Sequence, residues 1–218
     1  MKNISFVIII FSFLVSCSKD KPITQPQNTT QPDNIFYHNF QPNITMHSVL
    51  YFIPNQDPES CGDYPVPSDT STSFKINLDG DTTNDFIFNV ATNPSSGAGG
   101  SFHCAHIVYT ISISGIHAGD SISFTTKNYI QVPVYYDTVS NNVITKNELW
   151  RNNVMLSLSG QGVLLPGTAS FGDAYIGVKI KNNVGWIHVA PIGLNGVIIK
   201  ECAINLTPCN SIKAGQKN

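Results

Sequence analysis

The stretch that decides the fold is residues 174–206, which read AYIGVKIKNNVGWIHVAPIGLNGVIIKECAINL. It contains three runs rich in β-branched and aromatic residues, and the runs are separated by Asn, Gly and Pro. This is the pattern of strands joined by turns. In the first run Ile176, Val178 and Ile180 alternate with polar or small residues, so we expect these three side chains to face a core. The three predicted strands are 174–181, 185–190 and 197–206.

Shorter runs of the same kind occur upstream, and turn-forming residues separate them as well. No segment shows a long apolar pattern of helical period; residues 147–152 could form one helical turn. These features predict an all-β fold, an antiparallel β-sandwich or jelly roll of about nine or ten strands. The upstream strands are expected at 48–53, 73–78, 85–92, 107–114, 122–126, 130–136 and 155–158.

The N-terminus has the organisation of an export signal. Lys2 is followed by an almost wholly apolar run over 4–15. That run is shorter than the roughly 20 residues of a transmembrane helix, and it fits the core of a signal peptide. It ends in Leu14-Val15-Ser16-Cys17, which resembles the lipobox of bacterial lipoproteins. The resemblance implies a lipid on Cys17 and attachment to the membrane through it; the alternative is an ordinary signal peptide.

The residues directly after Cys17 suggest a destination. Ser18-Lys19-Asp20 resembles the charged export signal of Bacteroidetes-type lipoproteins, which implies the outer membrane, on its periplasmic or cell-surface face. The following segment is rich in Pro, Thr, Gln and Asn, a composition that cannot bury enough apolar surface to fold. The predicted organisation is a signal peptide at 1–16, a lipid-anchored disordered linker at 17–40, a β-sandwich domain at 41–212 and a tail at 213–218.

Charge excludes one class of partner. The formal net charge is −2, the isoelectric point is about 6.3, and Arg151 is the single arginine of the chain. A row of phosphates needs a basic surface to bind it, and the sequence contains no cluster of basic residues. Nucleic acid is therefore not an expected partner.

Four cysteines remain beside Cys17, and an exported chain meets an oxidising compartment. An even number predicts two disulfides, for which three pairings are possible. We favour Cys202 with Cys209, which closes a small terminal loop, and Cys61 with Cys104. Tight Cys-x-x-Cys pairs of the zinc-binding kind are absent. His103 and His106 flank Cys104, but they would face opposite sides of a strand, so a shared metal is not expected there.

A loop rich in aspartate separates two of the predicted strands, within residues 77–86. Oxygen-bearing side chains occupy alternate positions, and calcium takes six to eight oxygen ligands, often from a tight acidic loop. The loop resembles the calcium loops of secreted bacterial β-domains, including integrin-type repeats and dockerins, although Thr82 stands where those loops usually have Gly. The resemblance implies a structural calcium ion; the alternative is a polar hairpin turn with solvated acids. The predicted ligands are Asn77, Asp79, Asp81, Asp85 and the carbonyl group of Thr83.

A second resemblance covers the C-terminal part. Tyr175-Ile176-Gly177-Val178, then Gly185-Trp186-Ile187-His188-Val189, then Ile212-Lys213-Ala214-Gly215-Gln216 are similar, in this order, to the ending of a group of uncharacterised secreted bacterial β-domain proteins. That group has no assigned activity, so the resemblance implies only successive strands, with Trp186 as a supporting aromatic residue.

No known catalytic motif is present: the sequence has neither a Gly-x-Ser-x-Gly elbow nor a His-Glu-x-x-His helix. We therefore expect no enzyme activity, and a glycan-active enzyme is the least favoured alternative. The leading expectation is a surface module that binds a glycan or another surface polymer, and a purely structural or adhesive envelope protein is the other alternative. Possible ligand-binding residues are Trp150, Glu148 and Arg151, in a polar segment.

Overall fold

The computed structural model describes residues 34–49, 70–96, 105–127, 130–136, 143–161, 172–193 and 195–218. In these ranges the regular structure consists of β-strands, without a helix. The strands are β1 (Ile35–His47), β2 (Thr70–Ile76), β3 (Phe86–Ser96), β4 (Ala105–Gly115), β5 (Ser121–Lys127), β6 (Ile130–Pro133), β7 (Tyr135–Tyr136), β8 (Val143–Ile144), β9 (Trp150–Arg151), β10 (Asn153–Gln161), β11 (Ala174–Ile180), β12 (Asn183–Pro191), β13 (Gly196–Asn205) and β14 (Ile212–Lys213).

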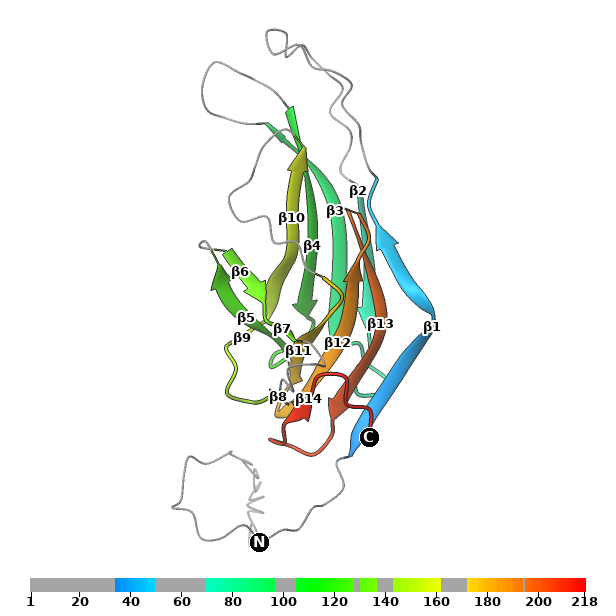
Figure 1. The fold of residues 1–218 in the computed structure, drawn as a ribbon, viewed down its shortest axis with the longest axis vertical. Helices are drawn as coiled ribbons and strands as arrows, with labels where there is room; N and C mark the ends of the chain where they lie inside the picture. The colour runs from blue at the N-terminus through cyan, green and yellow to red at the C-terminus, as the bar shows by residue number, and fades with distance from the viewer. Residues whose placement is uncertain are drawn as a thin grey trace, which may run out of the picture. The chain divides into compact units, whose positions relative to one another are not determined.

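The strands form two packed sheets and one small additional sheet (Figure 1). The large sheet has eight strands, in the order β1-β13-β12-β11-β5-β6, with β7 paired to β11 and β9 paired to β5. The second sheet has the order β10-β4-β3-β2, and β14 pairs with β8. All pairings are antiparallel. The predicted antiparallel β-sandwich is confirmed.

The predicted number of strands is too low, because the described residues contain fourteen. Four of these, β7, β8, β9 and β14, have two residues each, too few to leave an alternating pattern in the sequence. The possible helical turn at 147–152 is not formed, because β9 lies there and pairs with β5.

The main core lies between the two sheets. The predicted inward-facing residues of β11, Ile176, Val178 and Ile180, are all buried in it. On the four-stranded sheet Phe86 and Phe88 are fully buried in the same core. Alternation in β11 therefore identified its core-facing side chains correctly, because the side chains of a strand point to opposite faces in turn.

A second, smaller core covers the other face of the large sheet. Trp186 of β12 and Ala203 of β13 are paired residues, and both are fully buried in this cluster. Ile144 and Ile212, which pair β8 with β14, complete it. In Figure 1, β8 and β14 lie over the end of the large sheet that carries the C-terminus. The chain after β13 thus closes over a face of the sheet that would otherwise expose Trp186.

The domain begins earlier in the chain than the sequence predicts. β1 starts at Ile35, within the segment 17–40 assigned to the linker, and pairs with β13 from Ile35↔Asn205 to His47↔Gly196. Phe36 packs against the main core and Tyr37 against the second cluster, so this short run alternates between the two faces of the sheet. Of the strand expected at 48–53, Ser48 and Val49 follow β1 and the rest lies outside the described residues.

Candidate functional site

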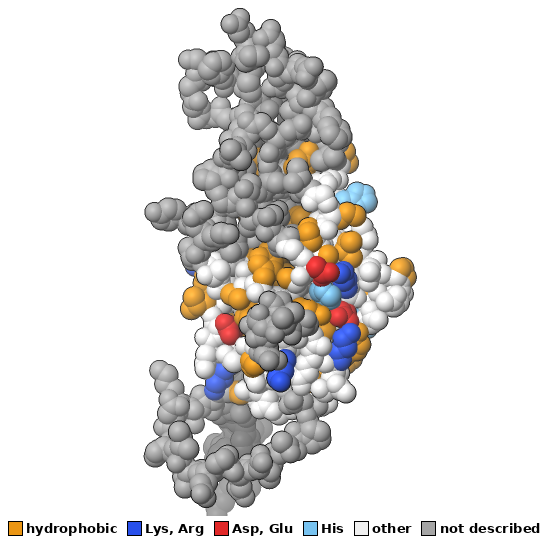
Figure 2. All heavy atoms as spheres, in the orientation of Figure 1, with side chains coloured by type: hydrophobic (Ala, Val, Ile, Leu, Met, Phe, Trp, Pro, Cys, Tyr) orange, Lys and Arg blue, Asp and Glu red, His pale blue; other side chains and the backbone are white. Residues whose placement is uncertain are grey.

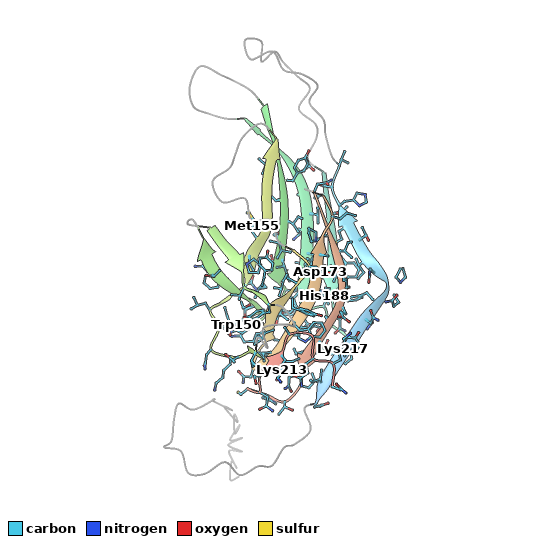
Figure 3. The ribbon with its side chains drawn as sticks, in the orientation of Figure 1. Trp150, Met155, Asp173, His188, Lys213 and Lys217 are labelled. Atoms are coloured by element: carbon cyan, nitrogen blue, oxygen red, sulfur yellow. The ribbon has the colours of Figure 1, made fainter. Side chains whose placement is uncertain are left out.

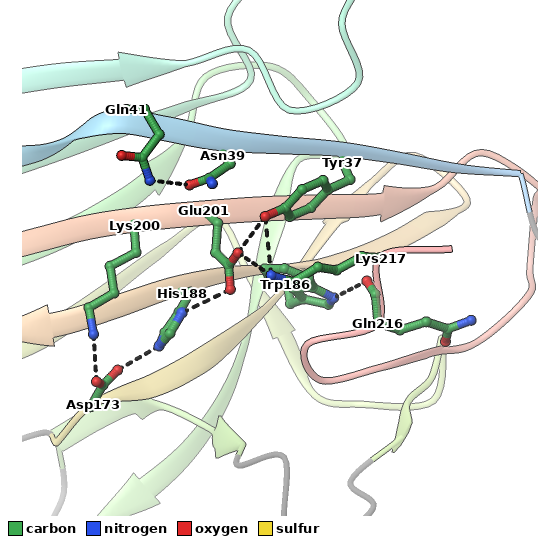
Figure 4. Close-up of polar contacts among 10 residues, drawn as sticks. All are labelled: Tyr37, Asn39, Gln41, Asp173, Trp186, His188, Lys200, Glu201, Gln216 and Lys217. Atoms are coloured by element: carbon green, nitrogen blue, oxygen red, sulfur yellow. Dashed lines mark hydrogen bonds and ion pairs between the residues drawn. The ribbon is translucent and has the colours of Figure 1, made fainter.

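A chain of polar contacts crosses the outer face of the large sheet (Figure 4). His188 of β12 lies between two carboxylates, with Nε2 2.5 Å from Asp173 Oδ1 and Nδ1 3.2 Å from Glu201 Oε1. Asp173 Oδ2 accepts a hydrogen bond from Lys200 Nζ at 2.5 Å. Lys217 Nζ donates to Glu201 Oε2 at 2.7 Å. In Figure 2, acidic, basic and histidine side chains lie together among hydrophobic ones on this face.

Tyr37 of β1 completes the chain at the edge of the sheet. Its hydroxyl group donates to Glu201 Oε2 at 2.6 Å and accepts a hydrogen bond from Lys217 Nζ at 3.2 Å. The ammonium group of Lys217 also lies 4.9 Å from the centre of the Tyr37 ring. We call the six residues the polar chain: Tyr37, Asp173, His188, Lys200, Glu201 and Lys217.

The charges of the polar chain stabilise one another. Burial raises the pKa of Glu201, but hydrogen bonds from Lys217, Tyr37 and His188 outweigh it and hold the pKa below its ordinary value. At Asp173 burial is likewise outweighed by hydrogen bonds from Lys200 and His188, and its pKa is lowered too. Hydrogen bonding to Glu201 and Tyr37 raises the pKa of Lys217 to about 12. The contacts therefore favour ionised carboxylates at Asp173 and Glu201 and a protonated amine at Lys217.

The polar chain has little spare bonding capacity. Both ring nitrogens of His188 and all four carboxylate oxygens of Asp173 and Glu201 already have partners. Tyr175 stacks on the ring of His188, with centroids 4.3 Å apart and planes inclined by 18°. A general base needs a nitrogen or oxygen that a substrate can reach. The arrangement is therefore suited to joining β1, β12, β13 and the C-terminal residues.

Sequence reasoning missed the polar chain. Of its six residues, only His188 belongs to a sequence motif for which a resemblance is stated. The contacts join residues as far apart as Tyr37 and Glu201, which meet only because β1 pairs with β13. An acid or histidine inside an apolar strand, such as Glu201 in β13, is the one available signal.

A groove of about 620 Å³ lies at the end of the large sheet covered by β8 and β14. Residues in 143–147 line one side, and residues in 209–216 line the other. The second wall is held in place by Trp186, whose Nε1 donates to the carbonyl oxygen of Gln216 at 3.2 Å. A backbone hydrogen bond of 3.0 Å from Gln216 to Lys213 closes the turn. The groove is lined mostly by side chains with amide, hydroxyl and ammonium groups.

The three predicted ligand-binding residues lie near the groove but do not line it. Trp150 is half-buried; its Nε1 donates to the carbonyl oxygen of Lys146 at 3.0 Å, and Lys179 Nζ lies 4.9 Å from its ring centre. Arg151 lies over the ring of Phe124. Glu148 Oε1 is within 3.5 Å of the hydroxyl group of Thr145. Trp150 therefore stabilises the 146–150 turn through its hydrogen bond to Lys146. The side chains of Glu148, Trp150 and Arg151 each contact different partners.

The acidic loop between β2 and β3 is folded by its own side chains. Asp79 Oδ1 accepts the N–H of Asp81 at 3.1 Å, and Asp81 Oδ1 accepts the N–H and the hydroxyl group of Thr83 at 2.6 and 2.7 Å. These bonds hold the pKa of Asp81 below its ordinary value. Asn77 contacts both ends of the turn, accepting from the Gly80 N–H at 2.8 Å and donating to the carbonyl group of Asp81.

Asp85 closes the loop from inside the protein. It is buried, and its Oδ2 accepts the N–H of Leu78 at 2.7 Å. Burial, together with the negative charges of Asp79, Asp120 and Asp81, raises its pKa to about 6, against the single lowering effect of the Leu78 hydrogen bond. A cation in the loop would relieve this repulsion.

The donor set of the loop fits calcium in kind, because it consists of carboxylate, amide and carbonyl oxygens. One oxygen of each aspartate takes a hydrogen bond from the loop, and the second takes none from the described residues. The carboxylates do not converge, however: within the described ranges no three His, Cys, Asp or Glu side chains are grouped closely enough to hold a metal ion. Asn77, Asp79, Asp81, Asp85 and the Thr83 carbonyl group are the residues that would hold one.

The predicted disulfide between Cys202 and Cys209 is wrong. Cys202 carries a free thiol group in the main core, and burial raises its pKa to about 12. Cys209 follows β13 and lines the groove on the other side of the sheet. The pattern of apolar residues in β13 directs Cys202 inward, which the spacing of cysteines alone does not reveal. Cys17, Cys61, His103 and Cys104 lie outside the described residues, as does the side chain of His106.

Comparisons of the chain with protein-family models, with curated proteins and with solved structures found no match. Nothing among the described residues forms a helix with the length and apolar character required to span a bilayer.

Proposed function

We propose that this chain is a lipid-anchored cell-envelope protein whose β-sandwich binds a glycan or another surface polymer in the groove between residues 143–147 and 209–216. The observation that carries the proposal is the groove itself. Its volume of about 620 Å³ is within the range of small-ligand sites, roughly 300–1,000 Å³. Its walls offer the hydrogen-bonding groups that a hydroxyl-rich ligand requires, among them Asn147, Asn210 and Ser211.

The rigidity of the groove supports binding over a purely structural role. Trp186 and the Lys213–Gln216 turn fix one wall, and the hydrogen bond from Trp150 to Lys146 fixes the other. A preorganised site loses less conformational entropy when a ligand binds. A structural or adhesive protein has no requirement for a hollow with polar walls at the end of the sandwich. Trp150 enters this proposal as a support and not as a platform on which a sugar stacks.

The test is polymer binding by the full chain purified in detergent, measured against immobilised neutral and acidic polysaccharides. Asn147→Ala/Asn210→Ala removes two groove amides and is expected to weaken the binding at least tenfold. Asn43→Ala/Asn84→Ala, which removes two exposed amides elsewhere, is the matched control and should bind normally. Absence of binding to every polymer, or equal binding by both double variants, would contradict the proposal and favour the structural alternative.

The anchor is part of the proposal and rests on the lipobox at Leu14–Cys17. In cells fed a labelled fatty acid, the chain is expected to incorporate label and to fractionate with the outer membrane. Cys17→Ser should lose both properties, whereas Thr24→Ala, in the polar segment beyond the lipobox and the export signal, should keep both. Unlabelled protein, or label that persists in Cys17→Ser, would contradict a lipid on this residue.

We also propose a structural calcium ion in the loop 77–85. Calcium is expected to raise the melting temperature of chelator-treated protein, and magnesium much less. Saturation to about a hundred times Kd stabilises by about 2.7 kcal/mol, which for this size of domain is roughly 5–11 °C. Asp81→Ala should abolish the shift, and Asn84→Ala, an exposed position of the same loop outside the ligand set, should retain it. If wild type shows no calcium-specific shift, the loop is a polar hairpin turn.

A further inference from the structure

Two lysine ammonium groups line the groove. Lys213 of β14 and Lys146, two residues beyond β8, both line it, and β14 pairs directly with β8. Among the described residues that line the groove there is no aspartate or glutamate. Within the described part of the chain neither lysine forms an ion pair. Figure 3 shows Lys213 near the same end of the domain as Trp150.

Three other lysines, two in the large sheet and one near the C-terminus, are treated differently. Lys200 and Lys217 pair with Asp173 and Glu201 at 2.5 and 2.7 Å. Lys179 lies over the ring of Trp150. These three ammonium groups therefore have partners, whereas the described residues form no ion pair with Lys146 or Lys213. In a chain with a formal net charge of −2, this is a local positive site, and positive walls of a concavity concentrate anions.

We infer that the groove selects an anionic saccharide, a sugar unit bearing a carboxylate or sulfate group, with Lys146 and Lys213 as its charge-recognising residues. This inference rests on the proposed function and names the class of polymer. The remaining lining argues for a saccharide, because Thr145, Asn147, Asn210 and Ser211 supply hydroxyl and amide groups. Among the described lining residues Val143 is the only large apolar side chain, which gives an acyl chain too little surface.

The experiment is calorimetric titration of the full chain in detergent with oligogalacturonate and heparin-derived oligosaccharides, with uncharged maltohexaose for comparison. Acidic oligosaccharides are expected to bind at least tenfold more tightly than the uncharged one, and the preference should shrink at 0.5 M salt because the Debye length falls. Lys146→Gln/Lys213→Gln should reduce acidic binding at least tenfold. Lys75→Gln/Lys181→Gln removes two exposed lysines outside the groove and should leave it unchanged.

The outcomes separate this inference from the proposed function. Equal binding of neutral and acidic oligosaccharides, or undiminished acidic binding by Lys146→Gln/Lys213→Gln, would overturn the inference and leave glycan binding in place. Binding of neither kind of oligosaccharide would overturn both. Glycerol 3-phosphate serves as a probe for a phospholipid headgroup; if it binds as tightly as the acidic oligosaccharides and depends on the same two lysines, the saccharide assignment is overturned.

Discussion

His188 of β12 and Glu201 of β13 are directly paired residues of neighbouring strands, and His188 Nδ1 lies 3.2 Å from Glu201 Oε1. The pair follows Trp186 and precedes a register shift between His188 and Val189, on the face opposite the main core. Only 16% and 11% of the two side chains are exposed. The contact therefore joins two strands at a place where water screens charges weakly. Its contribution to the free energy of unfolding can be measured.

A double-mutant cycle of His188→Gln and Glu201→Gln is expected to give a coupling free energy of about 1–3 kcal/mol in urea unfolding. Each single substitution is expected to lower the free energy of unfolding, because it leaves the largely buried partner side chain with an unsatisfied hydrogen-bonding group. The cycle of Lys200→Gln and Asp173→Asn is the comparison. Asp173 is 57% exposed, so we expect only about 0.2–1 kcal/mol from that ion pair. If the coupling free energy of His188 with Glu201 is no larger than that of Lys200 with Asp173, the polar chain does not stabilise the sheet through His188.

Acid should destabilise the fold through the same carboxylates. The pKa values of Glu201 and Asp173 lie below their ordinary values of 4.5 and 3.8, so the unfolded chain takes up protons first as the pH falls. Their contribution is fully present above about pH 5 and is lost as the pH falls through the lowered values. Between pH 5 and pH 2.5 the melting temperature of Glu201→Gln should fall less steeply than that of wild type. Parallel curves would contradict the role given to Glu201.

Gly80 tests how closely the acidic loop packs on β1. Its φ is +77°, and a Cβ atom placed there would lie 2.5 Å from Cε2 of Phe36. Gly119 also has a positive φ, +100°, but a Cβ atom there would meet nothing closer than 3.7 Å. In chelator, Gly80→Ala is expected to destabilise by roughly 2–3 kcal/mol and Gly119→Ala by about 1 kcal/mol, because only the first adds a steric overlap to backbone strain.

The background Phe36→Ala controls for that overlap. There the cost of Gly80→Ala should fall to that of Gly119→Ala, as measured by urea unfolding of wild type, the three single variants and Phe36→Ala/Gly80→Ala. An unchanged cost would mean that backbone strain alone accounts for Gly80.

The thiol group of Cys202 should be inert in the folded protein. It is fully buried and its pKa is raised to about 12, so the reactive thiolate is scarce at pH 8. Peptide mass spectrometry after iodoacetamide treatment is expected to find Cys202 unmodified in the native state and alkylated in guanidinium chloride. Cys202→Ser should lower the free energy of unfolding by about 1–3 kcal/mol, because it buries a hydroxyl group at a position built for a thiol. Cys202→Ala should lower it less. Labelling under native conditions would contradict the buried position.

Strand alternation made much of the fold predictable. Ile176, Val178 and Ile180 were assigned to the core from their spacing, and the structure buries all three. Two-residue strands such as β8 and β14 were not predictable, because they are defined by the partner they meet. β1 was assigned in part to the linker, since Asn and Pro surround its short apolar runs.

The sequence by itself determined the fold class, the core-facing side of the principal strands and the position of the acidic loop, because these depend on the spacing of neighbouring residues. Tertiary structure alone decided the rest. It directed Cys202 away from Cys209, joined Tyr37 to Glu201, and brought Lys146 and Lys213 to one groove. Each of these relations depends on which strands pair and in what register, and that is set by packing between distant segments rather than by local pattern.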